Sequence, residues 1–141
     1  MYVSDIMTAK PVTIQQNESL RRALEKMERV GCHHLPVLGY DGHLIGIISE
    51  RDCRVALNSP QVMRKYWQDE ELPDKILVRA IMTPAPTVIE PDAPAEEAAR
   101  LMLANYIGSL PVMRGETLVG IITKSDILIA FMNMMHTTAA D

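Results

Sequence analysis

The chain has 141 residues, of which 48% are hydrophobic and 23% charged, and this is the composition of a folded globular protein rather than of a disordered one. Its formal net charge of −4 gives no general attraction for nucleic acid, and no apolar stretch is long enough to span a bilayer. The N-terminus lacks the basic and apolar run of a secretion signal, and two cysteines are too few for a disulfide scaffold, so a reducing, cytoplasmic setting is predicted.

Two long stretches of the chain repeat one another, which indicates an internal duplication. The matching tripeptides are residues 6–8 and 81–83 (Ile-Met-Thr), 35–37 and 110–112 (Leu-Pro-Val), and 46–48 and 120–122 (Gly-Ile-Ile). The offset is 75 residues for the first two pairs and 74 for the third. The missing residue falls near Gly39–Gly42, where a hairpin turn is predicted, and turns absorb such deletions readily.

The first copy has the pattern β-α-β-β-α. Asn17 is placed to cap a helix that ends at Gly31. The inward face of this helix carries apolar residues at helical spacing, namely Leu20, Ala23, Leu24 and Met27. Two short apolar strands and a second helix are predicted to follow, at Leu35–Leu38, Leu44–Ser49 and Glu50–Leu57.

A linker interrupts the pattern between the copies. It contains the only Trp, and we expect a short helix held against the body by Tyr66 and Trp67, then a loop around Glu71-Leu72-Pro73. A pinned linker is favoured here over a cofactor platform. The predicted boundaries are 1–57 for repeat 1, 58–76 for the linker and 77–141 for repeat 2 with its apolar C-terminal helix.

The second copy follows the same plan. Asp92 is placed to cap its first helix, with Pro94 in the first turn. The inward face of that helix is predicted to carry Ala95, Ala98, Ala99 and Met102. The strands are predicted at Leu110–Met113 and Thr117–Thr123, and the last helix from Lys124 to about Met135. Because one such unit cannot bury its small sheet alone, two copies are expected to pack sheet to sheet with pseudo-two-fold symmetry.

These residues resemble the cystathionine-β-synthase-type (CBS) repeat family over about 3–57 and 77–135. The match consists of the Ile-Met-Thr segment, the helix, the Leu-Pro-Val strand and a Gly-hydrophobic-hydrophobic-[Ser/Thr]-x-x-Asp heptapeptide at the last strand–helix junction. The layout is most similar to stand-alone bacterial pairs related to acetoin-utilisation proteins. The resemblance implies an α/β (α+β) fold of two β-α-β-β-α CBS repeats, the Bateman module.

The two heptapeptides, 46–52 and 120–126, are the predicted functional core. Ser49 and Thr123 stand where a hydroxyl and unpaired amides at a helix N-terminus favour phosphate. Asp52 and Asp126 can accept hydrogen bonds from the two hydroxyls of a ribose. A purely structural interpretation fits equally well, in which the same side chains cap the helix as a capping box, and the two roles are compatible.

The resemblance implies two clefts, each combining the hydroxyl and Asp of one repeat with segments of the other. Cleft A would comprise Thr123, Asp126, Thr8, Val12, His33, His34 and Pro36. Cleft B would comprise Ser49, Asp52, Thr83, Thr87, Ile107, Gly108 and Pro111. The residues just before Leu-Pro-Val would present backbone groups to the adenine edge.

The two clefts are not equivalent. In cleft A, His33 and His34 crowd the base, and Lys124 adds positive charge beside the phosphate. In cleft B, Gly108 leaves room, and Arg54 either pairs with phosphate or is an ordinary solvated helix arginine. Cleft B is preferred by a small margin, and cleft A is either empty or selective for a different ligand.

Other chemistry finds less support in the sequence. Cys32, His33 and His34 are adjacent and cannot converge on one tetrahedral metal ion without strain, and no CxxC or HxxxH spacing occurs. Cys32 and Cys53 are predicted to be small apolar fillers near the core, or a redox pair if they lie within bonding distance. No nucleophile–base–orienter set is apparent, so we predict neither an enzyme nor a metal site.

The C-terminal helix is too apolar for a free surface. Ile127, Ala130, Phe131 and Met134 form one stripe, and Leu128, Met132 and Met135 another, and a single core cannot hide both. The alternatives are core packing and self-association. In the family the resemblance points to, such helices often stack two pairs into a homodimer, which is the expectation here.

The sequence therefore predicts a regulatory module that binds AMP, ADP or ATP, changes conformation on binding and signals to an unknown protein partner. S-adenosylmethionine or NAD could substitute, because they share the ribose and adenine contacts. The rival hypothesis is a ligand-free adaptor that serves only for dimerisation and interaction. Retention of the hydroxyl and the Asp in both copies favours the sensor.

Overall fold

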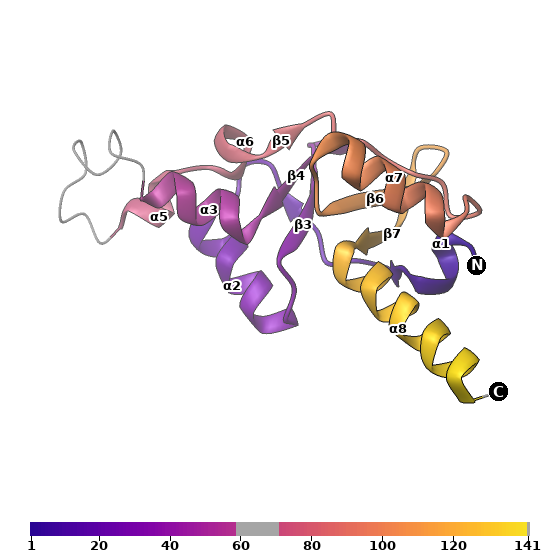
Figure 1. Ribbon diagram of the computed structural model, residues 1–141. Helices are drawn as coiled ribbons and strands as arrows, with labels where there is room; N and C mark the ends of the chain where they lie inside the picture. The colour runs from indigo at the N-terminus through magenta and orange to yellow at the C-terminus, as the bar shows by residue number, and fades with distance from the viewer. Residues whose placement is uncertain (59–70, 141) are drawn as a thin grey trace. The chain divides into compact units, whose positions relative to one another are not determined.

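The structure is a computed structural model that describes residues 1–58 and 71–140, with the side chains of 138–140 excepted (Figure 1). The chain divides into two compact units. Unit 1 comprises Met1–Pro11 and Thr87–Asp141, and unit 2 comprises Val12–Pro86. The units do not coincide with the sequence repeats, because each one takes the leading segment of the other repeat.

Unit 2 is built on a four-stranded sheet in the order β2-β3-β4-β5. Its strands are β2 (Ile14–Gln15), β3 (His34–Leu38), β4 (Leu44–Ser49) and β5 (Thr83–Pro84). The β2–β3 pair is parallel and the others are antiparallel. Its helices are α2 (Leu20–Val30), α3 (Glu50–Leu57), α5 (Leu72–Lys75) and α6 (Val78–Ile81).

Helix α2 begins later than the sequence predicted. Ser19, not Asn17, is its N-cap, and the Ser19 hydroxyl accepts the Arg22 amide at 3.2 Å. The prediction was wrong because the chain first makes a turn, in which the Glu18 amide donates to the Gln15 carbonyl at 3.1 Å. The end at Gly31 is confirmed, with φ +80° in the left-handed region. The predicted inward face is buried at Leu20, Ala23 and Met27, with Leu24 partly buried.

The linker differs from its prediction where it is described. The short helix expected around Tyr66 and Trp67 lies outside the described residues. The loop expected around Glu71-Leu72-Pro73 is wrong, because α5 forms there with Pro73 in its first turn, where the missing N–H is tolerated. Leu72 is buried, and Asp74 of α5 accepts from Arg21 of α2 at 2.8 Å.

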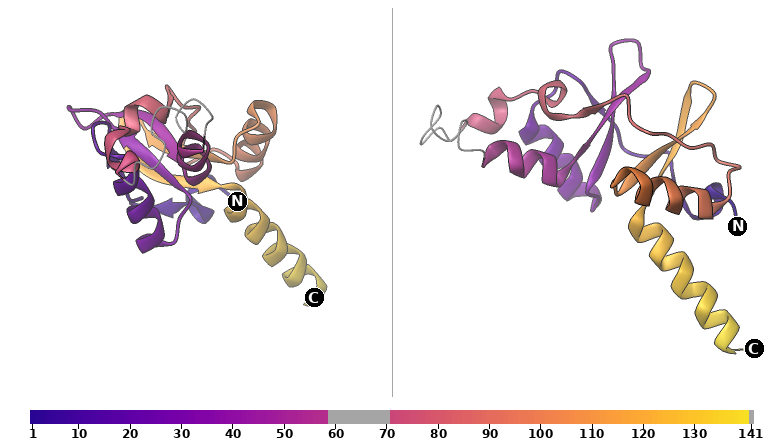
Figure 2. Two further views of the ribbon diagram at one scale, coloured as in Figure 1. Left: turned by 90° about the vertical axis from the view of Figure 1, so that its left-hand side faces the viewer. Right: turned by 45° about the horizontal axis from the view of Figure 1, so that its top comes forward.

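Unit 1 contains a three-stranded sheet in the order β1-β7-β6. Its strands are β1 (Thr8–Ala9), β6 (Ser109–Arg114) and β7 (Thr117–Thr123), and its helices are α1 (Val3–Ile6), α7 (Ala95–Asn105) and α8 (Lys124–Ala140). Ile89 adds a parallel bridge to Val112, as Ile14 does to Val37 in unit 2. Figures 1 and 2 show α8 leaving the end of β7 and extending past the rest of its unit.

Helix α7 is capped by backbone rather than by a side chain. Asp92 was the expected cap, but Pro94 occupies the N-cap position and makes no side-chain cap bond. Instead the Ala95 amide donates to the carbonyl of Met1 at 3.0 Å. The helix therefore depends on the N-terminal segment, which belongs to the other repeat in sequence.

The leading segments that the two repeats exchange, which contain β1 and β5, each pack closely against a glycine. A Cβ atom at Gly120 would lie 3.0 Å from the Thr8 carbonyl oxygen and would strike the Met7 side chain. A Cβ atom at Gly46 would likewise lie 3.0 Å from the Thr83 carbonyl oxygen. The glycine of each heptapeptide thus admits the close approach of β1 or β5. Val3 and Val78 complete the exchange, because each is fully buried in the core of the unit it joins.

The fold class predicted from the sequence is confirmed, since each unit is a mixed α/β body with its own buried core. None of the helices within residues 1–58 and 71–140 has the length and apolar character needed to cross a bilayer.

Candidate functional site

The first turn of α3 carries the hydroxyl and carboxylate that the sequence singled out. The Asp52 amide donates to the Ser49 hydroxyl at 3.0 Å, and the Ser49 amide donates to the Asp52 carboxylate at 2.9 Å. This is the reciprocal capping box, so the structural interpretation of these two residues is confirmed.

The first turn of α8 repeats the arrangement in unit 1. The Thr123 amide donates to the Asp126 carboxylate at 2.8 Å, and the Asp126 amide donates to the Thr123 hydroxyl at 3.3 Å. The duplicated sequence therefore produces the same local geometry twice, once in each unit.

The capping box leaves binding capacity on both side chains. Each Asp uses its Oδ2 oxygen on the backbone, while Oδ1 accepts no hydrogen bond from the described parts of the chain. The hydroxyls of Ser49 and Thr123 accept an amide but keep their own proton to donate. All four side chains are partly exposed. A ribose hydroxyl can therefore donate a hydrogen bond to the free carboxylate oxygen while the capping box stays intact. In the same way, a phosphate oxygen can accept a hydrogen bond from the Ser or Thr hydroxyl.

In unit 2 the segment before Leu-Pro-Val lies beside the unit's own helix start. His34 is opposite Ser49 in the β3–β4 ladder, and the Glu50 amide donates to the His33 carbonyl at 2.9 Å. Thr83 of β5 pairs with Ile47 of β4. Of the predicted site residues, the structure thus gathers in unit 2 Ser49, Asp52, Arg54, His33, His34, Pro36 and Thr83.

Unit 1 gathers the corresponding set. The Lys124 amide donates to the Gly108 carbonyl at 3.0 Å, and Thr8 of β1 pairs with Ile121 of β7. The residues brought together are Thr123, Asp126, Thr8, Ile107, Gly108 and Pro111. Val12 and Thr87 lie where the chain passes from one unit to the other. Clefts A and B combine residues of both units, and they stay predictions.

Glu50 lies within the predicted core 46–52, but the sequence analysis gave its side chain no role. Its carboxylate lies 2.7 Å from the His33 Nδ1 and 2.8 Å from both the Nε and a terminal nitrogen of Arg54. Hydrogen bonds from His33 and then from Arg54 hold the pKa of Glu50 below its ordinary value. The Glu50–Arg54 spacing of one helical turn was a readable signal, whereas the His33 contact comes from strand register.

Burial is the largest cause of the pKa shifts of three neighbouring groups. It lowers the pKa of His34, helped by the nearby His33 and opposed by Asp52. It also raises the pKa of Cys53 to about 11, with smaller contributions from Asp52 and Glu50. The pKa of Cys32 is raised as well, again by burial first. Both thiols are free, and Cys53 is fully buried in the core, as predicted for an apolar filler.

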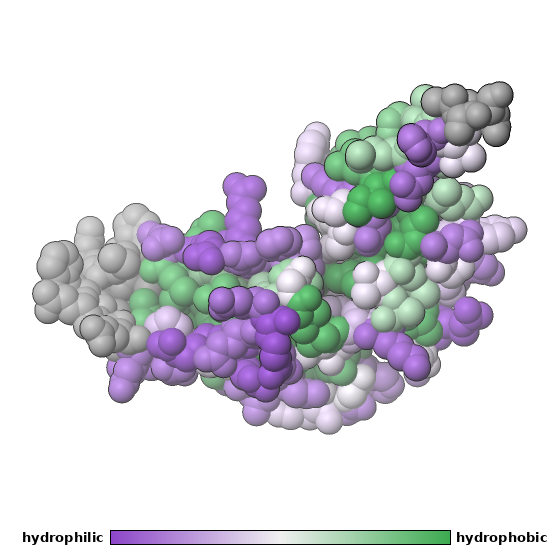
Figure 3. Space-filling view, turned by 90° about the horizontal axis from the view of Figure 1, so that it is seen from below, coloured by the Kyte–Doolittle hydropathy of each residue, from purple (hydrophilic) through white to green (hydrophobic). Residues whose placement is uncertain are grey.

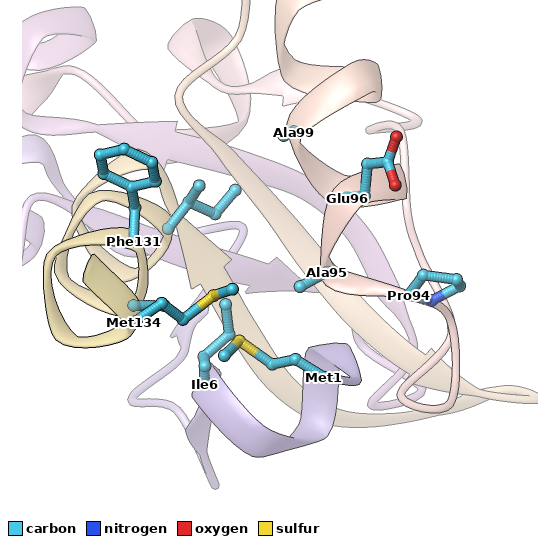
Figure 4. Close-up of a pocket in the computed structure, with 10 residues that line it drawn as sticks. Met1, Ile6, Pro94, Ala95, Glu96, Ala99, Phe131 and Met134 are labelled. Carbon is cyan, nitrogen blue, oxygen red and sulfur yellow. The ribbon is translucent and has the colours of Figure 1, made fainter. Parts of the chain in front are cut away.

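A second feature of unit 1 is an apolar groove of about 430 Å³ between α1, α7 and α8 (Figure 4). Ile6, Ala95, Ala99, Phe131 and Met134 are among the residues that line it. Further apolar side chains of α8 are more than half exposed, namely Leu128, Ile129, Met132 and Met135. Figure 3 shows this apolar surface along α8 towards its C-terminal end.

With this geometry established, the comparison with known proteins defines the class. The family model of the CBS domain matches residues 3–59 and 78–133. The chain therefore belongs to the CBS domain family and carries a pair of these domains. A CBS domain-containing protein of Dictyostelium discoideum is 36% identical over 89% of this chain and 88% of its own length. In several larger relatives the matched region makes up only 14% to 31% of the protein.

Solved structures of CBS pairs have the same fold. The pair of protein MJ0100, in complex with 5′-methylthioadenosine and S-adenosyl-L-methionine, has a TM-score of 0.81 at 27% identity, covering 95% of this chain and 98% of that one. An acetoin utilization protein (AcuB) of Vibrio cholerae has a TM-score of 0.76 at 28% identity, covering 100% and 97%. CBSX2 in complex with AMP has a TM-score of 0.75 at 27% identity, covering 95% and 98%. The predicted resemblance to acetoin-utilisation pairs is confirmed.

Proposed function

We propose that this protein is a regulatory module that binds an adenosine ligand at the first turns of α3 and α8. The observation that carries the proposal is the duplicated pair of hydroxyl and carboxylate, each held by a capping box with one carboxylate oxygen and one hydroxyl proton still available. Similarity to CBS pairs in complex with AMP, S-adenosylmethionine and 5′-methylthioadenosine supports it.

The proposed mode of binding follows from the chemistry of each group. Ser49 or Thr123 and the adjacent amides would take the phosphate, Asp52 or Asp126 the ribose, and the backbone before Leu-Pro-Val the adenine edge. AMP, ADP or ATP is the ligand we favour, with S-adenosylmethionine or NAD as substitutes. A ligand that contacts both repeats, as clefts A and B require, would shift their relative arrangement, and a protein partner would respond to that shift.

Regulation rather than catalysis is proposed because the hydroxyl and the carboxylate at each helix start are already engaged in the capping box. The acidic groups there accept backbone amides, and the buried Cys53, with its pKa raised to about 11, is a poor nucleophile at neutral pH. The two free thiols fit the reducing cytoplasm predicted from the sequence.

Homodimerisation is a second proposed property, carried by a different observation. Six large apolar side chains of α8 are more than half exposed, and two of them, Phe131 and Met134, line the groove of unit 1. Exposure of such an apolar surface to water is unfavourable, and a second copy of the chain would bury it. The same surface could serve the ligand-free adaptor that is the rival hypothesis.

Thermal unfolding with AMP, ADP, ATP, NAD and S-adenosylmethionine tests the ligand proposal. A ligand at about 100 times its Kd adds about 2.7 kcal/mol to the free energy of unfolding, which raises Tm by several degrees. The variants Asp52→Asn and Asp126→Asn keep an acceptor for the cap but lose the charge, and at least one should abolish the shift.

Ser19→Ala is the matched control, since it removes a helix cap in α2 without touching either site. It should lower Tm and leave the ligand-induced shift unchanged. If no compound of the panel moves the wild-type Tm at millimolar concentration, the adaptor hypothesis replaces the sensor.

A further inference from the structure

The two helix starts differ in the residue that directly follows the hydroxyl. In unit 2 this position is Glu50, and in unit 1 it is Lys124. The first turn of α3 carries two carboxylates and one guanidinium, from Glu50, Asp52 and Arg51. The first turn of α8 carries one ammonium and one carboxylate, from Lys124 and Asp126. The capping geometry is shared, and the charge beside the hydroxyl is one difference between the two sites.

Glu50 is fixed in place at the start of α3. Its carboxylate contacts His33 at 2.7 Å and Arg54 at 2.8 Å, and its side chain is 30% exposed. The contact with Arg54 engages a guanidinium that would otherwise be available to a phosphate, and Arg51, the other cation of this turn, lies between the two carboxylates in the sequence. An incoming phosphate must then either displace the carboxylate from both partners or lie beside it.

Lys124 has the opposite character. It lies at the start of α8, is exposed, and its ammonium makes no ion pair or hydrogen bond with the described residues. Its backbone amide is held by the Gly108 carbonyl at 3.0 Å, so the side chain starts from a fixed point beside Thr123. A phosphate bound to the Thr123 hydroxyl gains this cation, in addition to the helix dipole.

From this contrast we infer that the two sites take adenosine ligands of different charge. The Thr123 site takes a phosphate-bearing nucleotide, and the Ser49 site takes an adenosine derivative without phosphate, neutral or cationic at the 5′ position. Glu50 and Lys124 are the specificity-determining residues. The inference rests on the proposed function and reverses the preference for cleft B, because Arg54 is bound by Glu50 rather than available to phosphate.

Isothermal titration of the full chain with AMP and with 5′-methylthioadenosine tests the inference. Asp126→Asn should weaken the binding of AMP, and Asp52→Asn should leave it unchanged. For 5′-methylthioadenosine, Asp52→Asn should weaken binding and Asp126→Asn should leave it unchanged. Lys124→Gln should weaken the affinity for AMP by about 5- to 10-fold and leave the affinity for 5′-methylthioadenosine unchanged. That loss should shrink in high salt, since the charge is exposed.

Glu50→Gln is the reciprocal variant and frees Arg54 and His33 while keeping a side chain of the same shape. It should strengthen AMP binding at the Ser49 site by about 5- to 10-fold, or add a second AMP equivalent. If AMP binding depends on Asp52 instead of Asp126, or if neither charge variant alters AMP affinity, the inference is overturned while the proposed function stands. If neither compound nor any other adenosine ligand binds wild type, both fail.

Discussion

His34 couples the candidate site of unit 2 to pH. Burial, together with the nearby His33, lowers its pKa below the ordinary value of 6.5, against the opposing effect of Asp52. Since the unfolded chain binds the proton more readily, the free energy of unfolding should fall as pH drops through about 6.5 and stop falling below the folded pKa. His34→Gln should flatten the part of this dependence between pH 7.5 and 5, measured by urea unfolding.

His136→Gln provides the comparison for an exchange of His for Gln, because this histidine is exposed on α8 in unit 1. The lowered pKa of Glu50 acts in a separate window, since it contributes stability that is lost only as pH falls below about 4.5. An unchanged slope in His34→Gln above pH 5 would contradict the assignment to His34.

At the scale of single residues, the sequence predicted the two capping boxes because each is a local interaction. Ser49 with Asp52, and Thr123 with Asp126, are three residues apart, so the helix start itself dictates the contact. The contact of Glu50 with His33 spans 17 residues and depends on the β3–β4 register. Residue types alone could not reveal it.

Among the elements, the short strands β1 and β5 are held by close approach to a glycine. Ala at position 120 would place a methyl group 3.0 Å from the Thr8 carbonyl and against the Met7 side chain. Gly120→Ala should therefore displace β1 and lower the free energy of unfolding by about 1–3 kcal/mol. Gly46→Ala should act in the same way on β5 of unit 2. Urea unfolding measures both.

A double variant separates this clash from a general preference for glycine in the strand. Met7→Ala removes the side chain that the new methyl group would strike, so Met7→Ala with Gly120→Ala should be less destabilised than the sum of the two single variants. Strict additivity, or no loss in Gly120→Ala, would show that β1 is not seated on Gly120.

The elements were largely predictable, but their ends and their partners were not. Periodicity and turn residues located β4, α3 and β7 with the observed bounds. The caps expected at Asn17 and Asp92 were wrong because a preceding turn moves the N-cap of α2 to Ser19, and a carbonyl from Met1 serves the start of α7. The exchange of leading segments between the repeats is decided by tertiary packing and not by local sequence, because both repeats have the same glycine at the position that contacts the segment.

On the scale of the whole molecule, the apolar side chains of α8 are only partly covered by the rest of unit 1. Phe131 lines the groove of unit 1 and is 58% exposed, and Met134 beside it is 54% exposed. A stable protein–protein interface covers roughly 800 Å² on each partner, and an apolar helix face continuous with a groove supplies surface of that kind. Self-association through α8 would bury what a single chain exposes.

We therefore expect wild type to sediment as a dimer at micromolar concentration and Phe131→Glu to sediment as a monomer, because a carboxylate in an apolar interface would be desolvated without a partner. The variant should keep most of its free energy of unfolding within one chain, since the side chain is already more than half exposed. Tyr40→Glu, at an aromatic residue that is 74% exposed in the turn before β4, is the matched control and should stay dimeric. A wild-type monomer, or a Phe131→Glu variant that remains dimeric, would mean that the apolar face of α8 contacts something other than a second copy.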